Sequence, residues 1–120
     1  MRPATREEID RYLASRGMSF DGEPKAKAYV IESGAYSMLV VVCELSDVDC
    51  EVHIVCPKDY IVKSRELAQL GMLELSEMGY ANAYTAIEQG KYKSAHNFAK
   101  RIGFEQVGCY NEQIVYKRVL

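Results

Sequence analysis

The chain has 120 residues, of which 48 % are hydrophobic and 27 % are charged, and its 15 basic and 17 acidic residues give a formal net charge of −2. These values are close to the averages of globular proteins, and we expect one domain over residues 1–120. The balanced charge argues against a nucleic-acid or membrane-surface partner, and no apolar run reaches the roughly 18 residues that cross a bilayer.

The first predicted element is a helix that begins after Thr5. The Thr5 hydroxyl can accept a hydrogen bond from the backbone N–H of Glu8, and the Glu8 carboxylate can reach back to the N–H of Thr5, which is a capping box. Gly17 is typical of a helix end. The next segment, 19–25, contains a glycine and a proline and predicts a turn. The apolar residues at helical spacing are Ile9, Tyr12 and Leu13.

Three strands are expected next. The second is apolar almost throughout, so we expect it to be central and covered on both faces. Short turns at Ser33–Ala35 and 46–49 separate the strands, and Pro57 ends the third because proline lacks a backbone donor. The three runs are 26–33 (AKAYVIES), 36–45 (YSMLVVVCEL) and 50–56 (CEVHIVC).

The second half alternates helices and strands. Helical spacing predicts a long helix over 62–78 that ends at Gly79, and a short helix over 93–103. Strands are expected at 81–88 and on either side of Asn111-Glu112, at 105–110 and 113–119. The resulting order predicts a mixed α/β sheet with helices on both faces. The residues expected to face inward are Leu67, Leu70, Leu73, Leu75 and Met78 on the long helix, and Ala95, Phe98 and Ile102 on the short one.

The cysteines at 43, 50, 56 and 109 favour reduced core thiols over disulfides. The N-terminus has charged residues with no apolar stretch behind them, so we do not expect a secretory signal. No pair of cysteines has C-x-x-C spacing, and His53 and His96 are far apart in sequence. The sequence therefore predicts no metal site.

Three stretches resemble the GNAT superfamily of acyl-CoA-dependent N-acetyltransferases: "MRPATREEIDRYL", "FAKRIGFEQVG" and "IVYKRVL". The resemblance implies a GNAT-like fold, with a mostly antiparallel central sheet and helices on both faces. The family uses acetyl-CoA and acetylates amines. The compact length, the weak motif and the overall sequence pattern also resemble small GNAT-like proteins of tailed phages, some of which are internal virion components.

The resemblance implies a CoA pyrophosphate site at the start of the long helix, where the family carries R/Q-x-x-G-x-G/A. Here Tyr60 stands at the first position, and Lys63 and Arg65 replace the two glycines. In one interpretation Lys63, Ser64 and Arg65 bind the phosphates through charge and a hydroxyl. In the other, bulky side chains fill the cofactor space and Arg65 pairs with Asp59 or Glu66.

The family's general acid, a tyrosine four residues before the glycine of G-F, is Ala99 here, and alanine cannot donate a proton. Tyr92 and Tyr60 are possible substitutes, or ordinary surface or core tyrosines. His53 alternates onto one strand face with Glu51. It is the candidate base if that face looks into the substrate cleft, and otherwise a covered histidine on the helix-packed side or a partly exposed one.

Cys56 stands where the family binds the pantetheine arm, either as a nucleophile or as a core thiol.

The changed cofactor loop and the missing general-acid tyrosine lead to three hypotheses. The leading one is a non-enzymatic, phage-type structural or assembly component without a cofactor. It would associate with other virion proteins or with itself, in the host cytoplasm or the virion. The alternative is an active acetyl-CoA-dependent N-acetyltransferase. A third is a binding module that uses the opening between the fourth and fifth strands. An opening filled by Arg65 or Tyr60 would favour the scaffold, and an open one the enzyme.

Overall fold

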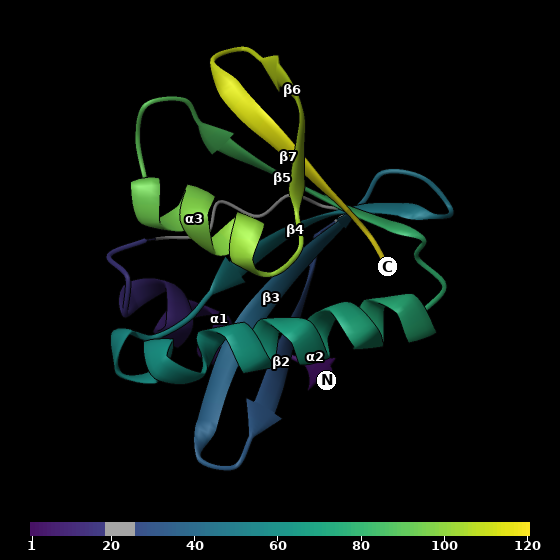
Figure 1. The fold of residues 1–120 in the computed structure, drawn as a ribbon. Coiled ribbons are helices and arrows are strands. Elements are labelled where there is room, and N and C mark those ends of the chain that lie inside the picture. The colour runs from purple at the N-terminus through teal and green to yellow at the C-terminus, as the bar shows by residue number, and fades with distance from the viewer. Residues whose placement is uncertain (19–25) are drawn as a thin grey trace.

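The computed structural model describes residues 1–18 and 26–120, and the turn expected at 19–25 lies outside this part. In chain order the elements are β1 (Arg2–Pro3), α1 (Arg6–Ala14), β2 (Ala26–Ser33), β3 (Tyr36–Glu44), β4 (Asp49–Val55), a 3₁₀ helix η1 (Lys58–Lys63), α2 (Ser64–Glu77), β5 (Asn82–Glu88), α3 (Lys93–Arg101), β6 (Glu105–Tyr110) and β7 (Gln113–Val119) (Figure 1). The predicted order is confirmed, with β1 and η1 as additions.

The described strands form one seven-stranded sheet in the order β1-β2-β3-β4-β5-β7-β6. Every neighbouring pair is antiparallel except β4 and β5, which run parallel. The short β1 adds an edge pair, because Arg2 lies opposite Val30 on β2. The mixed, mostly antiparallel sheet confirms the expected fold class.

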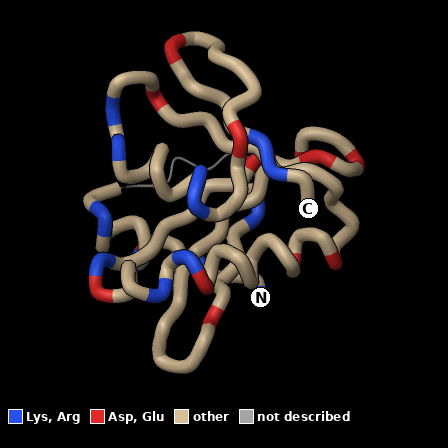
Figure 2. The backbone as a smooth tube through the Cα atoms, in the orientation of Figure 1, with Lys and Arg blue, Asp and Glu red and all other residues tan. Residues whose placement is uncertain are grey.

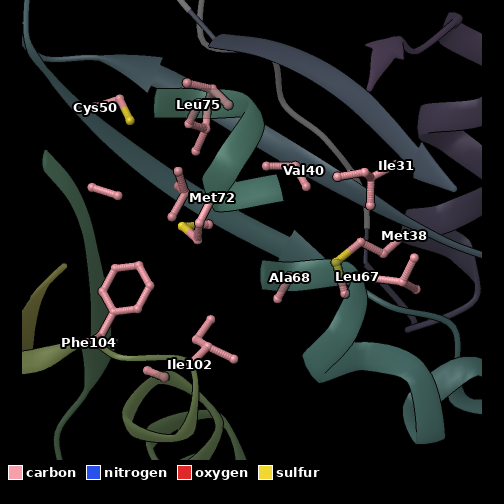
Figure 3. Close-up of a cluster of buried hydrophobic side chains, with 14 of the residues drawn as sticks. Ile31, Met38, Val40, Cys50, Leu67, Ala68, Met72, Leu75, Ile102 and Phe104 are labelled. Carbon is pink, nitrogen blue, oxygen red and sulfur yellow. The ribbon is translucent and has the colours of Figure 1, made fainter. Parts of the chain in front are cut away.

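The sheet has a separate apolar core on each face, because successive strand residues point to opposite sides. On one face α1 covers β2 and β3, and the buried residues are Tyr12, Leu13, Val30, Leu39, Val41 and Val55. On the other face α2 and α3 lie side by side over the sheet (Figures 1 and 3). This larger core includes Met38, Val40, Val52, Leu67, Met72, Leu75, Ile102, Phe104 and Tyr116. Helices therefore cover both faces, as expected.

Part of the inward assignment for the helices is wrong. Leu70, Leu73 and Met78 of the long helix are exposed, and so is Ala95 on α3. A helix that lies on a sheet buries one stripe only, and on α2 that stripe holds two small residues that let the helix approach closely. The buried residues of α2 are Leu67, Ala68, Gly71, Met72 and Leu75. The helix also begins at Ser64, after η1, and not at Val62.

The start of α1 confirms the capping box. The Glu8 backbone N–H donates to Thr5 Oγ1 at 3.2 Å, and the Thr5 N–H donates to Glu8 Oε1 at 3.0 Å. The Arg2 guanidinium donates to both Glu8 carboxylate oxygens, at 2.8 and 2.7 Å. Gly17 has φ +67°, which suits the left-handed end of a helix. Glu8 thus ties the first strand to the first helix.

Acid should weaken this link. The hydrogen bond from Arg2, followed by that from Thr5, lowers the Glu8 pKa from the ordinary 4.5 to about 2. Between these values the folded state binds fewer protons than the unfolded state, so the stabilisation is present above pH 4.5 and is lost as pH falls toward 2. We expect the urea midpoint to fall over this window more steeply in the wild type than in Glu8→Gln. Glu7→Gln is the control, and equal slopes for wild type and Glu8→Gln would contradict the prediction.

No described helix is both long and apolar enough to span a membrane.

Candidate functional site

The parallel strands β4 and β5 separate in the middle of the sheet. They pair at Asp49–Asn82, Cys50–Ala83 and Glu51–Tyr84, and among the described residues their ladder stops there. Both strands continue beyond this point, as Val52–Val55 and Thr85–Glu88, and Figure 1 shows them diverging. We call these two segments the fork.

Each arm of the fork is held from its outer side. β4 pairs with β3 as far as Val55, and β5 pairs with β7 as far as Glu88. The inner edges of both arms therefore present backbone N–H and C=O groups that the sheet does not use. Such edges can pair with an extended ligand that carries amide groups. Ile54 and Ile87, which are partly buried against the α2–α3 core, add apolar surface on the two arms.

Glu51 and His53 lie together where the fork opens. Glu51 belongs to the last β4–β5 pair, and His53 Nε2 lies 2.7 Å from Glu51 Oε1. Because Cys50 and Val52 point into the α2–α3 core, Glu51 and His53 project to the other face of the sheet. The hydrogen bond from His53 lowers the Glu51 pKa, although partial desolvation opposes the shift. An ionised Glu51 accepts from Nε2–H, so the lone pair of the neutral His53 ring lies on Nδ1.

A second histidine pair lies on the α2–α3 side. His96 Nδ1 is 2.7 Å from the Tyr116 hydroxyl oxygen, and His96 Nε2 is 2.9 Å from the Glu88 carbonyl oxygen. A carbonyl only accepts, so Nε2 carries a proton, and in the neutral ring Nδ1 accepts from the Tyr116 hydroxyl. Tyr116 is 2 % exposed and lies opposite Thr85, the first β5 residue of the fork.

Sequence reasoning missed this His96–Tyr116 pair. Ala99 is buried in the core, and His96 stands three residues earlier, on a neighbouring part of the same helix surface. The strand alternation of β7, which puts Ile114 and Tyr116 on one face, was the available signal. It could not identify His96 as the partner, because the two residues come from different elements.

Neither Tyr60 nor Tyr92, the two proposed substitutes for the general acid, belongs to the His96–Tyr116 pair. The Tyr60 ring packs edge-on against Tyr36 of β3, with ring centroids 5.6 Å apart. Tyr92 is exposed at the start of α3, with a left-handed φ of 57°. It borders an open depression of about 550 Å³ that His96 and Tyr116 also line.

The segment before α2 is not a loop whose backbone N–H groups are left for a ligand. It is the 3₁₀ helix η1, in which the Tyr60 N–H donates to the Pro57 carbonyl at 2.9 Å and the Ser64 N–H to the Ile61 carbonyl. The Ser64 hydroxyl also donates to the Ile61 carbonyl, at 2.7 Å. No side chain caps the start of α2. Backbone groups here are largely used by the turn itself.

The two cations at this point lie at the surface. Lys63 Nζ is 3.4 Å from Glu66 and 5.9 Å from the centre of the Tyr36 ring. Arg65 is exposed, and within the described part of the chain it forms neither of the ion pairs suggested for it, with Asp59 or with Glu66. Arg65 therefore stands at the start of α2 with its charge directed to solvent.

Cys56 follows the β4 arm and is partly buried. Desolvation raises its pKa, and the nearby charge of Arg16 opposes the shift only in part. A raised pKa keeps the thiol protonated and makes it a poor nucleophile. None of the four cysteines forms a disulfide in the described part of the chain. Cys50 is buried, but Cys109 is exposed and is not the core thiol that the sequence suggested.

Among the described residues no cluster of three or more histidine, cysteine or acidic side chains could hold a metal ion.

Solved structures share the whole fold. A domain from Methanocaldococcus jannaschii DSM 2661 aligns with a TM-score of 0.71 and 17 % identity, over 99 % of this chain and 96 % of that one. IAA acetyltransferase from Bacillus cereus ATCC 14579 aligns with a TM-score of 0.72 and 13 % identity, over 99 % and 97 %. A GNAT family acetyltransferase from Elizabethkingia anophelis, solved with acetyl-CoA bound, aligns with a TM-score of 0.65 and 12 % identity, over 97 % and 84 %.

The chain therefore has the GNAT acetyltransferase fold. No protein-family model matches the sequence, and the search of curated proteins finds no match.

Proposed function

We propose that the chain binds an acyl-CoA thioester in the fork and transfers the acyl group to an amine. The observation that carries this proposal is the separation of β4 and β5 after the Glu51–Tyr84 pair. Two unpaired backbone edges in the middle of a sheet suit a narrow, extended ligand with its own amides, and the pantetheine arm of CoA is such a ligand.

The residues at the start of α2 fit the phosphates of CoA through side-chain charge. Backbone donors are engaged in η1, so Lys63 and the solvent-directed Arg65 would supply the attraction for the anion. Exposed charges are screened by salt, and we therefore expect binding that weakens with ionic strength. This arrangement differs from a glycine-rich cradle but satisfies the same electrostatic requirement.

His53 is assigned the role of general base. Its Nδ1 lone pair can accept a proton from the amine, while Glu51 orients the ring through Nε2 and stabilises the charge that develops on it. Acyl-CoA, when bound, supplies an acyl group activated as a thioester. His53 is exposed and Glu51 is partly exposed, which leaves this face of the sheet accessible to an acceptor amine.

Thermal unfolding with acetyl-CoA tests the proposal. At a ligand concentration tenfold above Kd, binding stabilises the folded state by about 1.4 kcal/mol, which raises Tm by roughly 5 °C in a domain of this size. Lys63→Glu should abolish the shift, whereas Lys91→Glu, a matched exposed change near α3, should retain it. Release of free CoA thiol in the presence of a panel of amines then measures transfer.

No shift at millimolar acetyl-CoA would remove the proposal in favour of the second candidate, a non-enzymatic structural or assembly component of a virion. Two observations favour that candidate: η1 uses the backbone donors before α2, and Ala99 stands in place of a phenol. Recovery of the chain within purified particles, together with the absence of a shift, would support it.

A further inference from the structure

Three exposed apolar side chains lie at the end of the sheet where β4 and β5 begin. Leu45 and Val48 belong to the turn between β3 and β4 and are 54 % and 48 % exposed, and Met78, which follows α2, is 46 % exposed. The Val48 carbonyl accepts from the Ala81 N–H at 2.7 Å, so this turn lies against the turn after α2 (Figure 1). We call Leu45, Val48 and Met78 the end patch. Neither apolar core of the described structure includes them.

Acidic side chains flank the end patch. Glu44 precedes the β3–β4 turn, Asp47 lies within it, and Glu77 is the last residue of α2 (Figure 2). All three are exposed, and in the described part of the chain none of them forms an ion pair. Residues 28–57 and 66–90, which include both turns, contain no lysine or arginine. The end patch is therefore apolar at its centre and acidic around it.

Two further features make the potential at this end negative. The dipole of α2 places partial negative charge at its last turn, which contains no basic residue. Desolvation raises the pKa of the partly buried Tyr80, and the nearby charge of Glu44 adds to the shift. The acidic group at the end of β3 therefore acts on the turn after α2, and the two turns share one negative field.

The basic residues on the neighbouring strands offset little of this charge. On β7, Lys117 Nζ lies 6.0 Å from the centre of the Tyr84 ring, and Arg118 Nη1 donates to Gln69 Oε1 at 2.7 Å. Lys27 is exposed on β2, opposite the third residue from the end of β3. One such exposed cation compensates only part of the charge of three unpaired carboxylates.

We propose that the end patch binds a basic amphipathic segment of a partner protein, with its lysine or arginine side chains beside Glu44, Asp47 and Glu77. Apolar side chains of the segment would cover the end patch, while opposite charges guide and align it. A second copy of this chain does not meet the requirement, because a two-fold contact would bring carboxylates against carboxylates. The fork opens at the other ends of β4 and β5, so this inference does not depend on the acyl-CoA proposal.

The complex should be weak and sensitive to salt. Three half-exposed anchors make a small contact, and charges at the surface are screened, so we expect a Kd on the order of 100 µM that rises with ionic strength. The probe is a fluorescein-labelled amphipathic peptide of about 14 residues, with leucines on one helical face and lysines on the other. A peptide with glutamates in place of the lysines is its control.

Paired variants test both parts of the surface by fluorescence anisotropy. Asp47→Lys/Glu77→Lys should weaken binding of the lysine peptide by about tenfold, and Leu45→Ala/Met78→Ala by about fivefold. Glu7→Lys on α1 and Val107→Ala on β6 change exposed residues of the same kinds elsewhere and should leave Kd unchanged. Circular dichroism checks that each variant folds.

Amide chemical shifts locate the bound peptide. On addition of the lysine peptide, we expect shifts in residues 44–48 and 77–81. The absence of shifts there at millimolar peptide would overturn the proposal, and so would equal affinity for the glutamate peptide. Weakening by Glu7→Lys as large as that by Asp47→Lys/Glu77→Lys would reduce the effect to overall charge and would also overturn it.

Discussion

Replacing Leu75 with alanine should lower the free energy of unfolding by about 2–5 kcal/mol. Leu75 is 0 % exposed and packs in the α2–α3 core (Figure 3). Truncation removes apolar contacts and leaves a cavity that the surrounding β-sheet cannot close. Because a domain of this kind has only about 5–15 kcal/mol of stability, a substantial part would be lost. Urea denaturation at low micromolar concentration measures the change.

Leu73→Ala provides the matched control on the same helix. Leu73 is 61 % exposed, so its truncation should change the free energy of unfolding by about 0.5 kcal/mol or less. Equal losses for the two variants would contradict the orientation of α2, in which Leu75 faces the core and Leu73 faces solvent.

Replacing His53 with alanine should lower kcat/KM for the acceptor amine by about 10²–10⁴-fold, provided that the chain transfers acyl groups. The variant removes the only ring nitrogen that the Glu51–His53 pair offers as a proton acceptor. The KM for acetyl-CoA should stay unchanged, since His53 is assigned no contact with the coenzyme. The acid limb of the pH–rate profile should disappear together with the base.

Glu51→Gln refines this test. Glutamine can still accept from Nε2–H but carries no charge, so the rate should fall less than in His53→Ala. The hydrogen bond from His53 lowers the Glu51 pKa, which keeps the carboxylate ionised at neutral pH in the wild type. Glu105→Gln, on the exposed β6, is the control. Wild-type rates in His53→Ala would assign proton removal to another group.

The start of α2 shows how a local departure in sequence can have two interpretations. Lys63 and Arg65 at glycine positions suggested either a crowded site or one rebuilt from charged side chains. In the fold, the Tyr60 ring packs against Tyr36, and Arg65 is exposed. The direction of a side chain depends on the course of η1, which residue types alone do not determine.

The sequence by itself determined the order of the main helices and strands and several of their ends, because these depend on interactions between near neighbours. Thr5 and Glu8 cap the first helix three residues apart, and Asn111 and Glu112 form the two-residue turn between the closing strands with φ of 50° and 62°. The mixed sheet followed from the order of these elements and from the two periods of apolar residues.

Only the tertiary structure decided where β4 and β5 part, that His96 meets Tyr116, and which side of α2 remains outside the core. Each of these depends on contacts between residues 20 or more positions apart or on the packing of a whole helix against the sheet. Periodicity describes which residues share a face. Which face is buried depends on how well it packs against the opposing surface, and the local sequence does not contain that surface.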